Sequence, residues 1–151
     1  MKWSALLALV LLSGAAFAVE ESEVLAEWVV ETGDARVEIY KAADGTYEGR
    51  LCWLKEPEYP QGDPEAGKPK RDRENPDKSL RDRPIQGLVF MTGFKFDGDG
   101  KWKGGKVYDA ESGKTYSCKM TLKDRDTLEI RGYIGVSLLG RNQTWKRHTA
   151  K

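Results

Sequence analysis

The side chains best suited to binding a ligand are concentrated between residues 72 and 83. This segment carries carboxylates, an amide and guanidinium groups, among them Asp72, Asn75, Asp77, Arg81 and Arg83. Two guanidinium groups could grip a carboxylate or a phosphate bidentately. The same residues could instead cap a short helix and tie down a loop by mutual ion pairs. Capping alone accounts for Asn75 and Asp77, which favours this second interpretation.

A second candidate group is aromatic and is spread along the chain. The residues that could line an apolar pocket are Trp28, Tyr47, Trp53, Phe90, Tyr116 and Tyr133. Small barrels also fill their interior with large side chains, so plain core packing explains the same residues equally well.

No pattern in the sequence indicates catalysis, a metal site or a cofactor. The single His148 lies near the C-terminus, which argues against a Ser-His-Asp triad and against zinc. Residues 97–100 (Asp-Gly-Asp-Gly) resemble the start of a calcium loop, but Trp102 stands where that loop needs Gly. We therefore expect a protein that is not an enzyme and has no metal and no cofactor. A hydrolase with an unrecognised carboxylate pair is the alternative.

The two cysteines, Cys52 and Cys118, leave two interpretations open. In an oxidising compartment they could form one disulfide. They could equally be two separate, buried and inert thiols. Each lies in an expected strand, and pairing requires Cα atoms closer than about 7 Å.

The N-terminus has the features of a cleavable signal peptide. A basic start is followed by an unbroken apolar run at residues 5–12 and by an A-x-A cleavage site at residues 16–18. The apolar run is shorter than the roughly 20 residues that span a bilayer. We expect residues 1–18 to be removed and residues 19–151 to be exported, to the periplasm or the medium.

The charge of the exported part is balanced. The chain has 25 Lys and Arg and 24 Asp and Glu, and Lys2 is the one charged residue before position 19. A neutral total with mixed signs argues against nucleic-acid binding, which needs a net basic footprint. Because no second apolar stretch follows, we expect no membrane-spanning segment in residues 19–151.

Glycine-containing turns separate runs of alternating polarity, which is the pattern of strands joined by hairpins. The expected strands are residues 25–30, 35–41, 47–54, 86–96, 102–108, 115–122, 127–133 and 142–147. A sheet of about eight strands removes its exposed edges by closing into an up-and-down barrel, and a sandwich is the alternative. The sequence therefore predicts an all-β antiparallel fold.

Residues 55–83 interrupt this pattern. They hold five of the six prolines and a dense mixture of charges, so they are too polar and too broken for a strand. A loop of this length in a compact domain is often functional. Asn75 and Pro76 suit the cap and the first position of a helix, so we expect a short helix over residues 76–81.

The two ends of the chain resemble those of lipocalins. Lipocalins open with a Gly-x-Trp motif on the first strand, and an Arg from the last strand often packs on that Trp. Residues 26–28 (Ala-Glu-Trp) stand in this place, and Arg141 and Arg147 flank Trp145 near the other end. A guanidinium can stack on the ring of Trp28 while it bonds loop carbonyls and so closes the barrel.

A longer resemblance begins at residue 72. Residues 72–88 are similar to the D-x-x-N-P-D-x-x-L-R-x-R-P-x-x-G-L signature of domain of unknown function family 2147, which consists of small exported bacterial proteins. Further matches follow in order at residues 102–109, 112–116, 128–133 and 140–145. The resemblance implies a lipocalin-like barrel, because members of known structure resemble lipocalins. The family has no established activity.

These features predict an exported barrel that binds a small amphipathic molecule, such as a fatty acid or another envelope lipid. Aromatic side chains would line its cavity and polar side chains of the loop would meet a head group, namely Tyr47, Trp53, Tyr116 and Tyr133, and Asp72, Asn75, Arg81 and Arg83. The alternative is a cell-envelope interaction module with a filled barrel, which acts through residues 55–83. An empty space of roughly 300 Å³ or more would favour the ligand.

Overall fold

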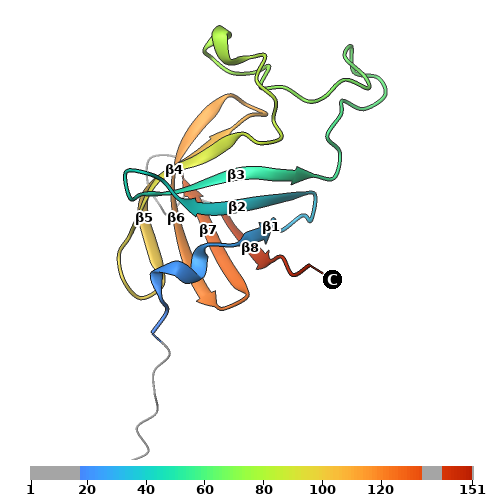
Figure 1. Cartoon of the computed structure of the whole chain (residues 1–151). Helices are drawn as coiled ribbons and strands as arrows, with labels where there is room; N and C mark the ends of the chain where they lie inside the picture. The colour runs from blue at the N-terminus through green and yellow to red at the C-terminus, as the bar shows by residue number, and fades with distance from the viewer. Residues whose placement is uncertain (1–17, 134–140, 151) are drawn as a thin grey trace, which may run out of the picture.

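Alternating polarity and glycine-containing turns produce an antiparallel meander that closes on itself (Figure 1). The computed structural model describes residues 18–133 and 141–150, so residues 1–17 of the expected signal peptide lie outside the described part. The strands within the described part are β1 (Glu27–Val29), β2 (Ala35–Lys41), β3 (Tyr47–Leu54), β4 (Val89–Phe96), β5 (Lys101–Asp109), β6 (Lys114–Asp124), β7 (Thr127–Tyr133) and β8 (Arg141–Arg147). Each strand pairs with its sequence neighbour, and β8 pairs with β1. The all-β up-and-down barrel is confirmed.

A short 3₁₀ helix, η1 (Glu21–Val24), crosses one end of the barrel and closes it. The buried indole of Trp28 donates a hydrogen bond of 3.0 Å to a backbone carbonyl of η1. The guanidinium of Arg147 lies 4.6 Å from the centre of the Trp28 ring and donates to the carbonyl of Glu23. The Tyr47 hydroxyl donates to the carboxylate of Glu21. We call this the closed end of the barrel.

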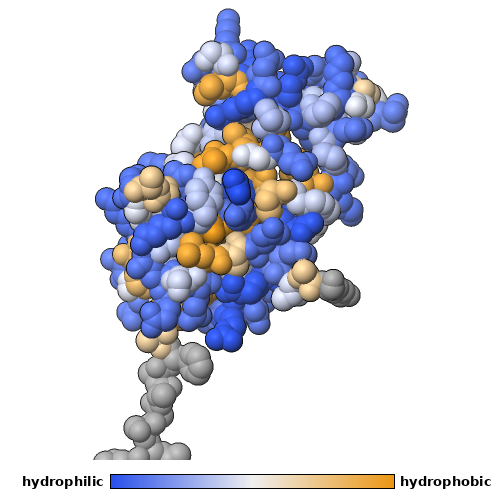
Figure 2. Space-filling model, viewed as in Figure 1, coloured by the Kyte–Doolittle hydropathy of each residue, from blue (hydrophilic) through white to orange (hydrophobic). Residues whose placement is uncertain are grey.

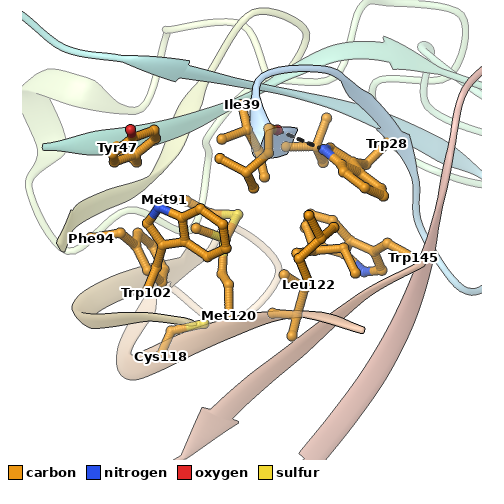
Figure 3. Packing of buried hydrophobic residues seen from close by; sticks show 14 residues of the cluster. Trp28, Ile39, Tyr47, Met91, Phe94, Trp102, Cys118, Met120, Leu122 and Trp145 are labelled. Carbon is orange, nitrogen blue, oxygen red and sulfur yellow. Dashed lines mark hydrogen bonds between the residues drawn. The ribbon is translucent and has the colours of Figure 1, made fainter. Parts of the chain in front are cut away.

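The hydrophobic core fills the barrel next to the closed end (Figure 3). Trp102 is fully buried and meets Tyr47 edge-on, with ring centroids 6.0 Å apart. The ring of Phe94 lies directly against Gly105 of β5, where a Cβ atom would overlap it. Because Gly105 has no side chain, the wall leaves room for the Phe94 ring, which is fully buried inside the barrel.

A β-bulge in β3 changes the direction of one predicted pocket residue. Leu51 pairs with Val37, whereas Arg36 pairs with Trp53, so Cys52 is the extra residue. One extra residue reverses the facing of those after it. The indole of Trp53 therefore lies against the guanidinium of Arg36, 4.7 Å from its carbon, rather than inside the barrel.

The segment between β3 and β4, residues 55–88, extends beyond the other end of the barrel (Figure 1). We call this segment the roof and that end the open end. The expected helix over residues 76–81 is a single 3₁₀ turn, η2 (Lys78–Leu80), capped by Asp77. Asn75 is not the cap, because its side chain is drawn to a buried carboxylate and accepts a bond only from the N–H of Asp77. In the described part of the chain, no helix is long and apolar enough to cross a membrane.

Candidate functional site

A hollow of about 1180 Å³ lies at the open end, between the barrel and the roof. Figure 2 shows hydrophobic side chains in the gap between the roof and the body of the barrel. The barrel wall of the hollow is mostly apolar and includes Leu51, Leu54, Phe90, Met91, Val107, Tyr116, Ile130 and Trp145. Its upper part is polar, because the roof carries charged side chains. An apolar wall beneath a charged cover suits an amphipathic molecule.

The roof is a small folded unit of three extended segments. The N–H of Lys70 donates to the carbonyl of Pro57 (2.8 Å), and the carbonyl of Lys70 accepts from the N–H of Ile85 (3.0 Å). Tyr59, Lys70 and Ile85 line the hollow. A separate groove of about 310 Å³ runs elsewhere on the roof and is lined by Lys68, Pro69, Arg71, Asp82 and Pro84. The roof therefore has an inner and an outer face.

A buried carboxylate fixes the second half of the roof, residues 69–88, to the barrel. Asp72 is fully buried and accepts hydrogen bonds from Tyr108 Oη (2.5 Å), Arg83 Nε (2.8 Å) and Asn75 Nδ2 (2.8 Å). Burial, and then the bond to Asp72, raise the pKa of Tyr108 to about 12, so this phenol remains a donor at neutral pH. Because Tyr108 belongs to β5, the bond joins the roof to the barrel wall.

A close backbone contact strengthens this attachment. Gly113, in the turn between β5 and β6, lies against the backbone carbonyl of Glu74 in the roof, and a Cβ atom at that position would overlap the carbonyl. Its φ of 71° is in the left-handed region that favours glycine. Only glycine combines this turn with such a close approach.

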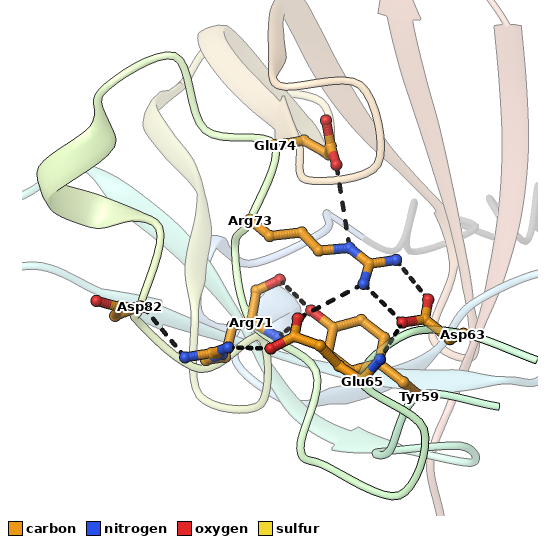
Figure 4. Close-up of polar contacts among 7 residues, drawn as sticks. All are labelled: Tyr59, Asp63, Glu65, Arg71, Arg73, Glu74 and Asp82. Carbon is orange, nitrogen blue, oxygen red and sulfur yellow. Dashed lines mark hydrogen bonds and ion pairs between the residues drawn. The ribbon is translucent and has the colours of Figure 1, made fainter. Parts of the chain in front are cut away.

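The first half of the roof, residues 55–68, is tied to the second half by ion pairs beside the hollow (Figure 4). Arg73 donates two hydrogen bonds to Asp63, of 2.9 and 2.6 Å, and its guanidinium lies 4.1 Å from the centre of the Tyr59 ring. Arg71 forms an ion pair with Glu65. The bonds from Arg73 hold the pKa of Asp63 at about 2. These two arginines therefore link two halves of the roof.

Both arginines that could have bound a head group are hydrogen-bonded to other residues of the roof. Arg83 is held by Asp72, and Arg81 Nε donates to the carbonyl of Asn75 at 2.7 Å. Neither arginine lines the hollow. The geometry matches the interpretation in which the polar cluster holds the loop. A role for these residues in ligand binding is a prediction that the geometry does not support.

The predicted aromatic residues do not form one group. Tyr116 lines the hollow, as does Phe90. Tyr47 lies in the core near the closed end, and Trp53 lies on the outer face because of the bulge in β3. Tyr133 is the last residue of β7, and its side chain lies outside the part that the structure describes.

The last strand contributes residues to the hollow that the sequence did not assign to a pocket; Arg141 was expected to close the barrel instead. Arg141, Gln143 and Trp145 of β8 all line it, and the Trp145 indole donates to the Gln143 side chain at 3.0 Å. Their spacing of two was visible in the sequence as one face of a strand. Arg147, rather than Arg141, stacks on Trp28.

The two cysteines are not joined in the structure. Cys52 lies in β3 and Cys118 in β6, so β4 and β5 separate them in the sheet. Cys118 is fully buried, and burial raises the pKa of its thiol to about 12. Within residues 18–133 and 141–150, no group of three or more His, Cys, Asp or Glu side chains could hold a metal ion.

A closed antiparallel barrel with one plugged end and a hollow at the other defines a lipocalin-like protein. The chain belongs to the family described as uncharacterized protein conserved in bacteria (DUF2147), whose model matches residues 26–147. It is similar to protein HP1028 from the human pathogen Helicobacter pylori, which is described as belonging to the lipocalin family. The two are 25% identical, with a TM-score of 0.69 over 83% of each chain. Comparison with the curated proteins gives no match.

Proposed function

We propose that this chain is an exported protein that binds a small amphipathic molecule in the hollow at the open end. The hollow carries the proposal, because its volume of about 1180 Å³ reaches the range of ligand pockets, which begins at roughly 300 Å³. The apolar part of the ligand lies against Leu51, Phe90 and Val107, which line the hollow and are only partly buried. Its polar part meets the charged roof. This volume favours ligand binding over an interaction module with a filled barrel.

Export is supported by the A-x-A pattern at residues 16–18 and by the packing of the residue that follows it. Val19 packs against the core beside Gly100, at the closed end of the barrel. A chain cleaved after Ala18 therefore keeps Val19 and η1, which close the barrel.

Native mass spectrometry tests the proposal directly. The protein, purified after export without detergent, is mixed with saturated fatty acids, fatty alcohols and lysophospholipids of roughly 12 to 18 carbons. We expect a complex with one ligand bound and a change in tryptophan fluorescence, because Trp145 lines the hollow. A protein that carries no lipid and accepts none from this panel contradicts the proposal.

Two neighbouring positions of β4 provide a matched pair of variants. Phe90 lines the hollow, whereas Val89 is exposed and is not among the residues that line it. Phe90→Glu places a carboxylate on the apolar wall, and we expect it to weaken binding by about tenfold or more. Val89→Glu adds the same charge and should leave binding unchanged. Circular dichroism checks that both variants remain folded, and equal binding by both would place the ligand elsewhere.

A further inference from the structure

The cationic side chains that line the hollow differ in how they are paired. Arg71 and Arg73 are already engaged by carboxylates of the roof. Three other cations line the hollow, and the described residues offer no hydrogen bond or ion pair to their side chains: Lys55, Lys70 and Arg141. Within the described residues, no partner would have to be displaced before these three met a ligand.

Lys70 differs from the other two in its surroundings. Lys55 and Arg141 are exposed, whereas Lys70 is half-buried on the inner face of the roof. Its backbone is held on both sides by the hydrogen bonds to Pro57 and Ile85. No described carboxylate is paired with the Lys70 ammonium group, so an anionic group in the hollow would supply the missing counter-charge.

Carboxylates also line the hollow, so its total charge does not by itself attract an anion. Asp63 is paired with Arg73, and Asp34 and Asp109 accept hydrogen bonds from neighbours in their own turns. The other carboxylates that line the hollow are exposed, where water and salt screen them: Glu56, Glu74 and Glu111. The half-buried inner face of the roof therefore presents the positive charge of Lys70.

We propose that Lys70 selects ligands whose head group is an anion, either a carboxylate or a phosphate, attached to an apolar tail. The ammonium group meets the head group as a point charge, and the tail lies on the apolar wall below. This inference rests on the proposed function, because it names the ligand class of the same hollow. It also transfers the head-group contact from Arg81 and Arg83, which are engaged in the roof, to a residue that lines the hollow.

Three ligands with the same hydrocarbon chain test this selection: palmitate, hexadecyl phosphate and hexadecanol. We expect the wild-type protein to bind at least one of the two anions about tenfold or more tightly than the neutral alcohol, measured by tryptophan fluorescence titration. Lys70→Gln should reduce this preference to about threefold or less, because it weakens the binding of the anions and leaves the binding of the alcohol unchanged. Lys70→Arg, which keeps the charge, should preserve it.

Lys68→Gln is the matched control, because it removes the same charge from the outer face of the roof. We expect it to leave the preference unchanged, and thermal unfolding verifies that all variants are equally folded. Equal binding of all three ligands by the wild type, or an intact preference in Lys70→Gln, would overturn the inference while the proposed function stands. A protein that binds none of the three contradicts the proposed function itself.

Discussion

The two ends of this barrel are held together by different kinds of interaction. At the closed end, Trp28 and Trp102 are fully buried, and the Trp28 indole is bonded to η1. At the open end, the roof is held over the hollow by the buried carboxylate of Asp72 and by the ion pair between Arg73 and Asp63. One end is stabilised by the burial of apolar surface, and the other by directional polar bonds.

This difference separates the part of the sheet that is densely packed from the part that surrounds the hollow. Burial of aromatic side chains is worth several kcal/mol per residue, and it requires close packing without empty space. Hydrogen bonds and ion pairs contribute less, but they can hold a segment at a distance from the barrel wall. A barrel that packs one end densely can therefore leave the other end hollow.

The largest effect should follow from a change at the closed end. Trp28→Ala removes a buried indole and the surface on which Arg147 stacks, so we expect a loss of about 3–5 kcal/mol in the free energy of unfolding. Trp53→Ala is the matched control, because its indole lies on the outer face beside Arg36 and should cost about 1 kcal/mol. Urea denaturation measures both. Similar losses for the two variants would show that the closed end is not the main source of stability.

A smaller and more local effect is expected at the open end. Asp72→Ala leaves Tyr108, Arg83 and Asn75 without their shared acceptor, and unsatisfied buried groups cost about 1–3 kcal/mol. Amide hydrogen exchange should become faster in residues 70–85 and remain unchanged in β1, β2 and β8.

Tyr108→Phe removes only one of these bonds and should show the same pattern with a smaller increase. A uniform increase across all strands in Asp72→Ala would mean that the roof and the barrel unfold together. That result would contradict the separation between the two ends.

The barrel could be predicted from the sequence because its signals are local. Each strand alternates in polarity over a few residues, and turns such as Asp44-Gly45 mark where it ends. The helical turn of the roof begins later than the sequence predicts, because Asn75 is hydrogen-bonded to Asp72 and does not cap it. Capping rules consider only the residues of the helix itself. Local patterns are sufficient where neighbours in sequence are also neighbours in space.

The hollow depends on contacts that no local pattern records. A single bulged residue turns Trp53 to the outside, although the alternation of β3 predicts the inside. Asp72 engages Tyr108, which is 36 residues away, and this contact holds Arg83 in place as part of the same network. The sequence shows which residues are charged, but only the fold shows that Lys70 is left without a partner among the described residues.

The smallest expected effect is a change in the roof at low pH. It tests whether this change comes from the ion pair between Arg73 and Asp63 alone. Bonds from Arg73 hold the pKa of Asp63 at about 2, below its ordinary value of 3.8. A lowered pKa means that the pair stabilises the roof above pH 3.8 and loses this contribution as the pH falls to about 2. The indole of Trp28 does not titrate in this range, so its bond to η1 should persist.

Nuclear magnetic resonance of the amides near Asp63, followed from about pH 6 to about pH 1.5, measures this midpoint. Arg73→Gln should raise the midpoint towards 3.8, because it removes the main cause of the shift. Arg71→Gln, which breaks the neighbouring pair with Glu65, should leave it near 2. Equal midpoints in the two variants would mean that the whole roof, rather than this pair, sets the acidity of Asp63. The two halves of the roof would then be joined by a cooperative network of contacts. In that respect the open end would resemble the cooperatively packed closed end.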